Sequence, residues 1–162
     1  MELTIRPVEP TDFAAMADLL NQIIAIGGTT AHTTPVDCHI LQSWYQRGQP
    51  YAAWFVAVDE SGQIMGFQFI EQNPKLPPDT ADIATFARIG ATGRGIGQKL
   101  FTATRAAAVT LGFSSITAVI RADNIGGLAY YSRLGMQDID VIEGRELSNG
   151  LIVDQVVKRL AL

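Results

Sequence analysis

The chain has 162 residues, of which 48% are hydrophobic and 17% charged, which indicates a folded chain with one sizeable core. Its formal net charge of −4 disfavours a general nucleic-acid binder, because neutralising phosphates needs a basic face. The single cysteine, Cys38, excludes an internal disulfide framework and a cysteine-rich zinc site. We therefore expect one domain over residues 1–162, with no nucleic-acid partner and no metal.

The first third of the chain predicts a strand and two helices. Leu3–Arg6 alternates between apolar and polar residues as a short strand does. A helix follows from Pro10, with apolar residues at helical spacing, and stops at Gly27. Thr29–Pro35 is a polar loop, and Val36–Arg47 predicts the second helix.

The middle of the chain predicts a β-hairpin and a further strand. Tyr51–Asp59 and Ile64–Glu71 are rich in aromatic and β-branched residues and flank a short turn. Asn73–Pro78 contains three prolines and predicts a loop. The next strand is expected over Asp82–Ile89, and the glycine-rich segment 90–97 ends it.

The last part of the chain alternates between helix and strand patterns. Apolar residues recur at helical spacing from Ile96 to Leu111. The remaining elements are a strand at Ser115–Ile120, a short helix at Asn124–Leu134 and two strands at Met136–Ile142 and Leu151–Leu160. The hairpin requires antiparallel pairing, whereas the strand–helix–strand unit favours a parallel pair. A mixed sheet with helices on both faces follows, which is an α/β fold (α+β in some schemes).

Targeting and membrane segments are not expected. The N-terminal residues Met1–Arg6 do not form a positive region followed by an apolar one. The longest uncharged run, Leu19–Val36, contains amide side chains, glycines and a proline at a density that a membrane helix does not carry. We therefore expect a cytoplasmic protein with no membrane partner.

The glycine-rich segment predicts an anion site. Four glycines gather where a strand gives way to a helix: Gly90, Gly93, Gly95 and Gly97. Glycines allow a close approach of the backbone, and free N–H groups at a helix start attract phosphates. The dinucleotide-binding and Walker patterns both fail, because Gln98 and Ile96 stand where a glycine and a lysine are needed. A ligand-free turn and a loop for another diphosphate remain open alternatives.

Two motifs are similar to those of the GNAT superfamily of acyl-CoA-dependent N-acetyltransferases. The cofactor loop of that family runs Gln/Arg-x-x-Gly-x-Gly/Ala; here Gly95 and Gly97 match its glycines, and Thr92 stands at the Gln/Arg position. The segment from Asn124 to Met136 resembles the family's Asn-x-x-Ala-…-Tyr-x-x-Leu-Gly-Phe helix. The motifs occur in the family's order, with a strand between them.

The resemblance implies a single-domain GNAT-like fold with a mixed, mostly antiparallel sheet of six to seven strands. It implies direct transfer of an acetyl group from acetyl-CoA, as cosubstrate, to a primary amine of a small molecule, amino-acid-like molecules included. A homodimer is a further implication. A domain that binds acyl-CoA as a sensor or partner module, without turnover, is the alternative.

The resemblance also assigns site residues. Tyr131 matches the tyrosine near the CoA sulfur and is the candidate general acid, since a phenol with a pKa of about 10 stays protonated at neutral pH. Glu71 is the preferred general base, with Asp82 or an ordered-water relay as alternatives. The cofactor-binding residues are Phe86, Ala87, Arg88, Thr92, Gly93, Arg94, Gly95, Ile96, Gly97, Gln98, Asn124 and Tyr131.

Residues of the acceptor site are expected in the loop between the first two helices. Thr29, Thr30 and His32 lie there, and in the family this loop walls the acceptor pocket. Histidine has a pKa suited to proton transfer, although an exposed loop histidine without a role is the plainer interpretation of His32. Trp44 and Trp54 lie in apolar periodic runs and are expected in the core.

Overall fold

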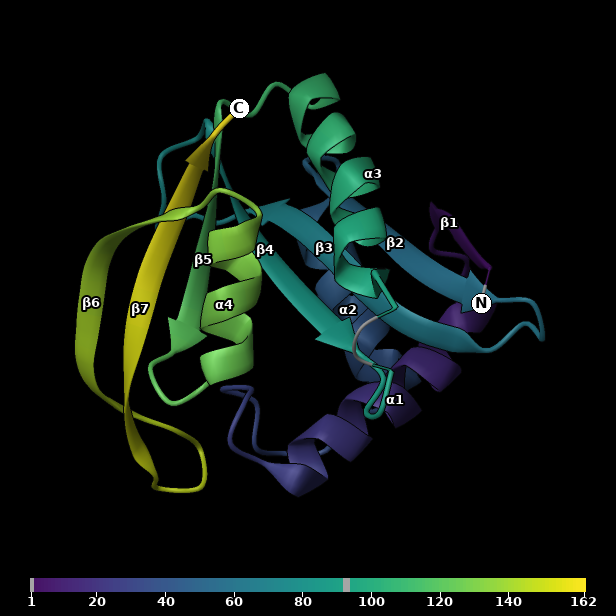
Figure 1. The fold of residues 1–162 in the computed structure, drawn as a ribbon, viewed down its shortest axis with the longest axis horizontal. Helices are drawn as coiled ribbons and strands as arrows, with labels where there is room; N and C mark the ends of the chain where they lie inside the picture. The colour runs from purple at the N-terminus through teal and green to yellow at the C-terminus, as the bar shows by residue number, and fades with distance from the viewer. Residues whose placement is uncertain (1, 92–93) are drawn as a thin grey trace.

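The structure is a computed structural model that describes residues 2–91 and 94–162. Within these residues, seven strands form one sheet in the order β1-β2-β3-β4-β5-β7-β6 (Figure 1). Neighbouring strands pair antiparallel except β4 and β5, which are parallel. The strands are β1 (Leu3–Pro7), β2 (Ala52–Asp59), β3 (Ile64–Gln72), β4 (Thr80–Ala87), β5 (Ser115–Arg121), β6 (Gln137–Glu146) and β7 (Ile152–Ala161).

Helices cover both faces of the sheet. In Figure 1, α3 and α4 lie in front of the sheet, and α1 and α2 lie behind it. The helices are α1 (Phe13–Ile26), which follows a 3-10 turn at Pro10–Asp12, α2 (Cys38–Gly48), α3 (Ile96–Thr110) and α4 (Ile125–Arg133). In the described ranges, no helix has the length and apolar character needed to cross a membrane.

These elements confirm the mixed, mostly antiparallel sheet predicted from the sequence. Most boundaries shift by a few residues; β4, for example, begins at Thr80 and β6 extends to Glu146. Two of the shifts have a clear local cause. The strand expected over Asp82–Ile89 ends at Ala87, because the Arg88 carbonyl accepts the Ala91 N–H (3.1 Å) and closes a turn. The second helix begins at Cys38 and not at Val36. The reason is that the Asp37 side chain accepts the Ile40 N–H (2.9 Å) and caps the helix there.

Apolar cores lie on both faces of the sheet. Behind the sheet, Trp54 stacks on Phe69 with ring centroids 3.9 Å apart, and Phe86 belongs to the same cluster under α1 and α2. In front of the sheet, Ile83 and Tyr131 belong to a second cluster under α3 and α4. Side chains alternate along β4, so its two faces have separate surroundings.

Strands β4 and β5 pair over only three positions before they diverge. Thr80–Asp82 faces Ser115–Thr117, and β4 then remains paired only with β3, through Ala87. Beyond the same point β5 remains paired with β7, through Arg121. Figure 1 shows the two arrows separating toward their C-terminal ends. From Ile83 onward, the backbone groups on this edge of β4 therefore have no strand partner and can bind a ligand.

Candidate active site

The start of α3 presents backbone N–H groups that the helix does not use. Gly95 caps α3 with φ at 71°, a left-handed conformation that favours glycine, and an added Cβ there would meet nothing within 4 Å. The Lys99 N–H donates to the Gly95 carbonyl (3.0 Å), so the N–H groups of residues 96–98 precede the helical ladder. Together with the positive end of the helix dipole, they suit an anion.

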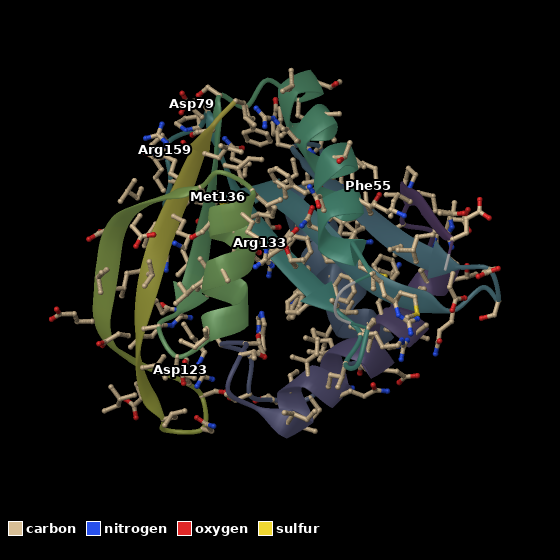
Figure 2. All side chains as sticks on the ribbon, in the orientation of Figure 1. Phe55, Asp79, Asp123, Arg133, Met136 and Arg159 are labelled. Carbon is tan, nitrogen blue, oxygen red and sulfur yellow. The ribbon has the colours of Figure 1, made fainter. Side chains whose placement is uncertain are left out.

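Cationic side chains lie near this helix start. Arg94 is exposed in the loop, and the predicted residues Thr92 and Gly93 lie outside the described residues. A cavity of about 620 Å³ separates α3 from α4, and Arg105 and Arg133 are among its lining residues. Figure 2 shows Arg133 on the side of α4 that faces α3. Free N–H groups and these cations fit the phosphates of acetyl-CoA.

Along β4, the backbone N–H and C=O groups of successive residues point alternately to β3 and to the open edge. The Arg88 N–H donates to the Met65 carbonyl on β3 (2.8 Å). By alternation, the backbone groups of Phe86 also point to β3, and those of Thr85 and Ala87 point to the open edge. Of the predicted backbone contacts to the pantetheine arm, the geometry therefore favours Ala87, with Thr85 added, over Phe86 and Arg88.

Tyr131 lies on α4 where the two strands diverge. Its side chain is buried in one cluster with Ile83 of β4 and Ile120 of β5, and its hydroxyl lies 2.8 Å from Thr85 Oγ1. Burial raises the pKa of the Tyr131 phenol, and the hydrogen bond with Thr85 offsets part of that rise. The phenol is therefore protonated at working pH and can act as a hydrogen-bond donor.

The loop after α1 is fixed through its backbone carbonyls. Asn124, whose Oδ1 caps α4, donates from Nδ2 to the Thr29 carbonyl (3.2 Å). Arg121 is buried at the end of β5 and donates to the Thr30 carbonyl (3.0 Å). Its guanidinium is also paired with Asp123 (2.7 Å), which Figure 2 shows at the base of α4. Thr29 and Thr30 thus contact the α4 end of the site through main-chain atoms.

Glu71 and Asp82 lie directly opposite each other on β3 and β4. Arg47 of α2 donates to both carboxylate oxygens of Glu71, at 2.7–3.2 Å. Asp82 accepts from Asn73 Nδ2, at 3.2 Å, and from the Ile83 backbone N–H. Burial raises the pKa of Asp82, and the nearby charge of Glu71 adds to that rise. Arg47 pairs with Glu71, whereas burial disfavours the charged form of Asp82, so this geometry favours Asp82, the alternative candidate, as the base.

A cavity of about 340 Å³ lies between the α1–α2 loop and the β6–β7 turn. His32 lines it, with the imidazole stacked on Trp44 (centroids 4.7 Å apart) and 6.4 Å from the Phe86 ring. Burial against these rings, with Arg47 and Arg145 nearby, lowers the pKa of His32, so the imidazole is neutral at pH 7. His32 as a residue is exposed, as expected, but one face of its ring is covered by Trp44. Trp44 is half-buried beneath it, whereas Trp54 is buried as predicted.

The contact between α3 and α4 at Gly97 gives a prediction. A Cβ at Gly97 would lie 2.5 Å from Tyr130 Cε1, so Gly97→Ala must displace that ring. We expect a loss of about 1–3 kcal/mol in the free energy of unfolding, as overpacking produces. We also expect CoA binding to weaken by about 10-fold, measured by calorimetry, because the helix start expected to hold the CoA phosphates shifts.

Gly126→Ala is the matched control for Gly97→Ala. Gly126 is the second residue of α4, as Gly97 is of α3, and the nearest atom to its added Cβ is 4.0 Å away. Alanine is the better helix former, so this variant should melt slightly higher than wild type. Equal melting temperatures for the two variants would show that the Tyr130 contact does not constrain Gly97.

Three residues of the site were missed from the sequence. Thr85 lies two residues after Ile83 in β4, so the two side chains point to the same face of the sheet. This could have been deduced once the strand was assigned. Arg121 and Arg145 carry no local signal. Their roles arise because the α1–α2 loop meets the end of β5 and the β6–β7 turn in three dimensions.

Comparison with known proteins gives a family. A family model described as "Acetyltransferase (GNAT) domain" matches residues 2–137. The chain is similar to "Putative phosphinothricin acetyltransferase YwnH" of Bacillus subtilis (strain 168), with 26% identity over 144 residues that cover 88% of each protein.

Solved structures share the whole fold. A crystal structure titled "a putative phosphinothricin N-acetyltransferase" superposes with a TM-score of 0.87, 25% identity and coverage of 99% of each chain. A phosphinothricin acetyltransferase from Sinorhizobium meliloti in complex with acetyl-CoA gives a TM-score of 0.88 at 20% identity, covering 100% of this chain and 89% of that one. With the family match over most of its length, the chain belongs to the GNAT superfamily and is an acetyl-CoA-dependent N-acetyltransferase.

Proposed function

We propose that the chain transfers an acetyl group from acetyl-CoA to the primary amine of a small, amino-acid-like molecule. The observation that carries the proposal is the divergence of β4 from β5, with a protonated phenol at the opening and a carboxylate of raised pKa beside it. Tyr131 supplies the phenol on the front face of the sheet. Asp82, the last residue of β4 to pair with β5, supplies the carboxylate on the rear face.

The cofactor site would be built from two parts of the chain. Acetyl-CoA, when bound, supplies a thioester carbonyl as electrophile and a thiolate as leaving group. The N–H groups of residues 96–98 would hold its phosphates, and the open edge of β4 at Thr85 and Ala87 would hold its pantetheine amides. Holding both ends orients the thioester for in-line attack.

The proposed reaction transfers two protons, one from the amine and one to the sulfur. As the new C–N bond forms and the C–S bond breaks, an Asp82 carboxylate oxygen accepts one proton from the attacking amine, directly or through a water. Tyr131 Oη gives one proton to the departing sulfur. Exchange with solvent then restores both side chains, so the reaction consumes no other reactant.

The acceptor would lie in the cavity that His32 lines. Its volume of about 340 Å³ suits a small molecule. Arg145 lines the cavity and donates to Gln155 Oε1 (3.2 Å), and among the described residues it forms no ion pair. The Arg145 guanidinium in the wall favours an acceptor that carries a carboxylate or another anionic group. That preference agrees with the phosphinothricin in the name of YwnH, an amino-acid-like amine.

A CoA-release assay over a panel of primary amines tests this function. We expect kcat/KM for an α-amino acid to exceed that for the corresponding amine without the carboxylate by about 10-fold or more. Arg145→Gln should remove that preference and leave CoA binding unchanged. Tight binding of acetyl-CoA without CoA release for any amine would instead support the sensor alternative.

A further inference from the structure

A chain of hydrogen bonds runs from the first turn of α3 to Tyr131. The Tyr130 hydroxyl donates to the Gly97 carbonyl (2.7 Å). Gln68 Nε2 on β3 lies 2.9 Å from Tyr130 Oη and 2.9 Å from Thr85 Oγ1. Thr85 Oγ1 then lies 2.8 Å from Tyr131 Oη. Four elements, α3, α4, β3 and β4, thus meet in one polar chain between the apolar side chains of the front core.

Counting hydrogens fixes the direction of these bonds from the Gly97 carbonyl as far as Thr85. The Gly97 carbonyl can only accept, so the one hydroxyl hydrogen of Tyr130 goes to it. Tyr130 Oη must then accept from Gln68, which fixes the Gln68 amide nitrogen on this side. The second amide hydrogen goes to Thr85, because an amide nitrogen does not accept. The hydrogen of Thr85 is then available to Tyr131 Oη, which lies 2.8 Å away.

This orientation of the Gln68 amide leaves one of its polar atoms without a hydrogen-bond partner. Gln68 is fully buried, and its Oε1 has no hydrogen-bond partner among the described residues. Turning the amide over would place Oε1 against two hydroxyls, but Tyr130 would then have two acceptors for one hydrogen. An unpaired buried carbonyl oxygen is unfavourable by about 1–3 kcal/mol, but the reversed amide would leave both of its hydrogens unpaired in the same place.

We propose that Gln68 and Thr85 are positioning residues that leave the hydroxyl hydrogen of Tyr131 free to point into the opening between β4 and β5. In the described part of the chain, Thr85 is the one polar partner of the Tyr131 hydroxyl. Since Thr85 donates to Tyr131, the phenol hydrogen is not consumed inside the protein. That the hydrogen is directed at the CoA sulfur rests on the proposed function.

The same direction supports Tyr131 after it has given up its hydrogen. A phenolate oxygen needs donors, and Thr85 already donates to it, so no side chain has to rotate during proton transfer. Tyr130 and Gln68 hold Thr85 in that role from the phosphate-binding end of the site. Variants of the positioning residues should therefore change kcat and leave KM for acetyl-CoA almost unchanged.

The donor–acceptor direction of the hydrogen bonds made by Gln68 can be tested without any cofactor. Nuclear magnetic resonance of the Gln68 side-chain amide should show two hydrogens that exchange slowly with solvent. Thr85→Val should expose one of them to exchange, and Tyr130→Phe the other. If both hydrogens remain protected in Thr85→Val, the amide does not donate to Thr85 and the proposed direction is wrong.

Calorimetry with CoA as the probe tests where the Tyr131 hydrogen points. A donor aimed at the sulfur favours the thiolate, so affinity should rise by about 10-fold between about pH 7 and pH 9, across the usual thiol pKa. CoA lacking the sulfur should show no such rise. Thr85→Val and Tyr131→Phe should lose the rise, whereas Thr85→Ser, which retains a hydroxyl, should keep it.

Thr104→Val is the matched control. Thr104 is fully buried on α3, and its Oγ1 has no partner in the described residues, so its hydroxyl is outside the chain. This variant should keep the pH dependence of CoA binding and the wild-type kcat, whereas Thr85→Val should lower kcat by about 10-fold.

The outcomes separate this inference from the proposed function. A rise in affinity that persists in Thr85→Val, or a wild type that binds CoA without any rise, would overturn the positioning role and leave the acetyltransferase site in place. A protein that binds no CoA would overturn the proposed site, while the protection of the Gln68 amide hydrogens would still decide the direction of the chain.

Discussion

Replacing Tyr131 by phenylalanine is expected to lower kcat by about 100-fold, the contribution of a well-placed general acid. The dissociation constant for acetyl-CoA should change little. The reason is that the phenylalanine ring still fills the front core beside Ile83 and Ile120, and only the hydroxyl next to Thr85 is lost. Steady-state kinetics with the best amine of the panel gives kcat, and calorimetry gives the affinity.

Tyr45→Phe serves as the control for Tyr131→Phe. The Tyr45 ring packs edge-on against Phe13 and Trp54 behind the sheet, and those ring contacts do not need the hydroxyl. Its kcat should equal that of the wild type. An unchanged kcat for Tyr131→Phe, under conditions in which chemistry limits the rate, would remove Tyr131 from the mechanism.

Asp82→Asn should lower kcat by about 100-fold and raise the melting temperature at pH 7. Loss of activity is expected because the amide cannot take a proton from the amine. The gain in stability is expected because burial raises the pKa of Asp82, so the charged carboxylate destabilises the folded chain at neutral pH. The fall in kcat tests the role of Asp82 as the base, and the rise in melting temperature tests its raised pKa.

The raised pKa of Asp82 predicts how the stability of the folded chain depends on pH. An aspartate in the unfolded chain titrates at about 3.9, and the pKa of Asp82 in the folded chain lies higher. The folded state therefore holds the proton over the interval between those two values. The wild type therefore loses stability relative to the Asp82→Asn variant as pH rises through that interval. Thermal melts of wild type and variant should converge in acid and separate toward pH 7.

Glu71→Gln distinguishes the two carboxylates. Glu71 is neutralised by Arg47 at 2.7 Å, so its loss should reduce stability and affect kcat less than Asp82→Asn does. A larger fall in kcat for Glu71→Gln than for Asp82→Asn would return the role of base to Glu71.

The elements of the fold could be predicted because each has a local cause. The glycines from Gly90 to Gly97 mark the strand-to-helix junction, and Asn124 marks the start of α4 as its cap. Tyr131 follows Asn124 on the same helix, so its position on α4 follows from local sequence, whereas its expected role came from the resemblance to the family motif. Residues whose position depends on one element and its cap are within reach of sequence reasoning.

The sequence alone could not distinguish Glu71 from Asp82 as the candidate base. Both are carboxylates at strand ends, and the sequence shows no difference between their surroundings. What separates them is Arg47, which α2 brings to Glu71 across the rear face. The same holds for Gln68, whose partners come from α4 and β4. Charges and polar partners brought together by packing have no signature along the chain.

The loop after α1 is attached by the carbonyls of Thr29 and Thr30, which accept from Asn124 and Arg121. A main-chain carbonyl is present whatever side chain the residue carries, so this attachment does not depend on the identity of the loop residues. The loop can therefore exchange the side chains that face an acceptor while its anchor to the cofactor half of the enzyme stays intact. We therefore expect substitutions at Ala31 and His32, which line the cavity, to change the choice of acceptor and to leave the affinity for acetyl-CoA unchanged.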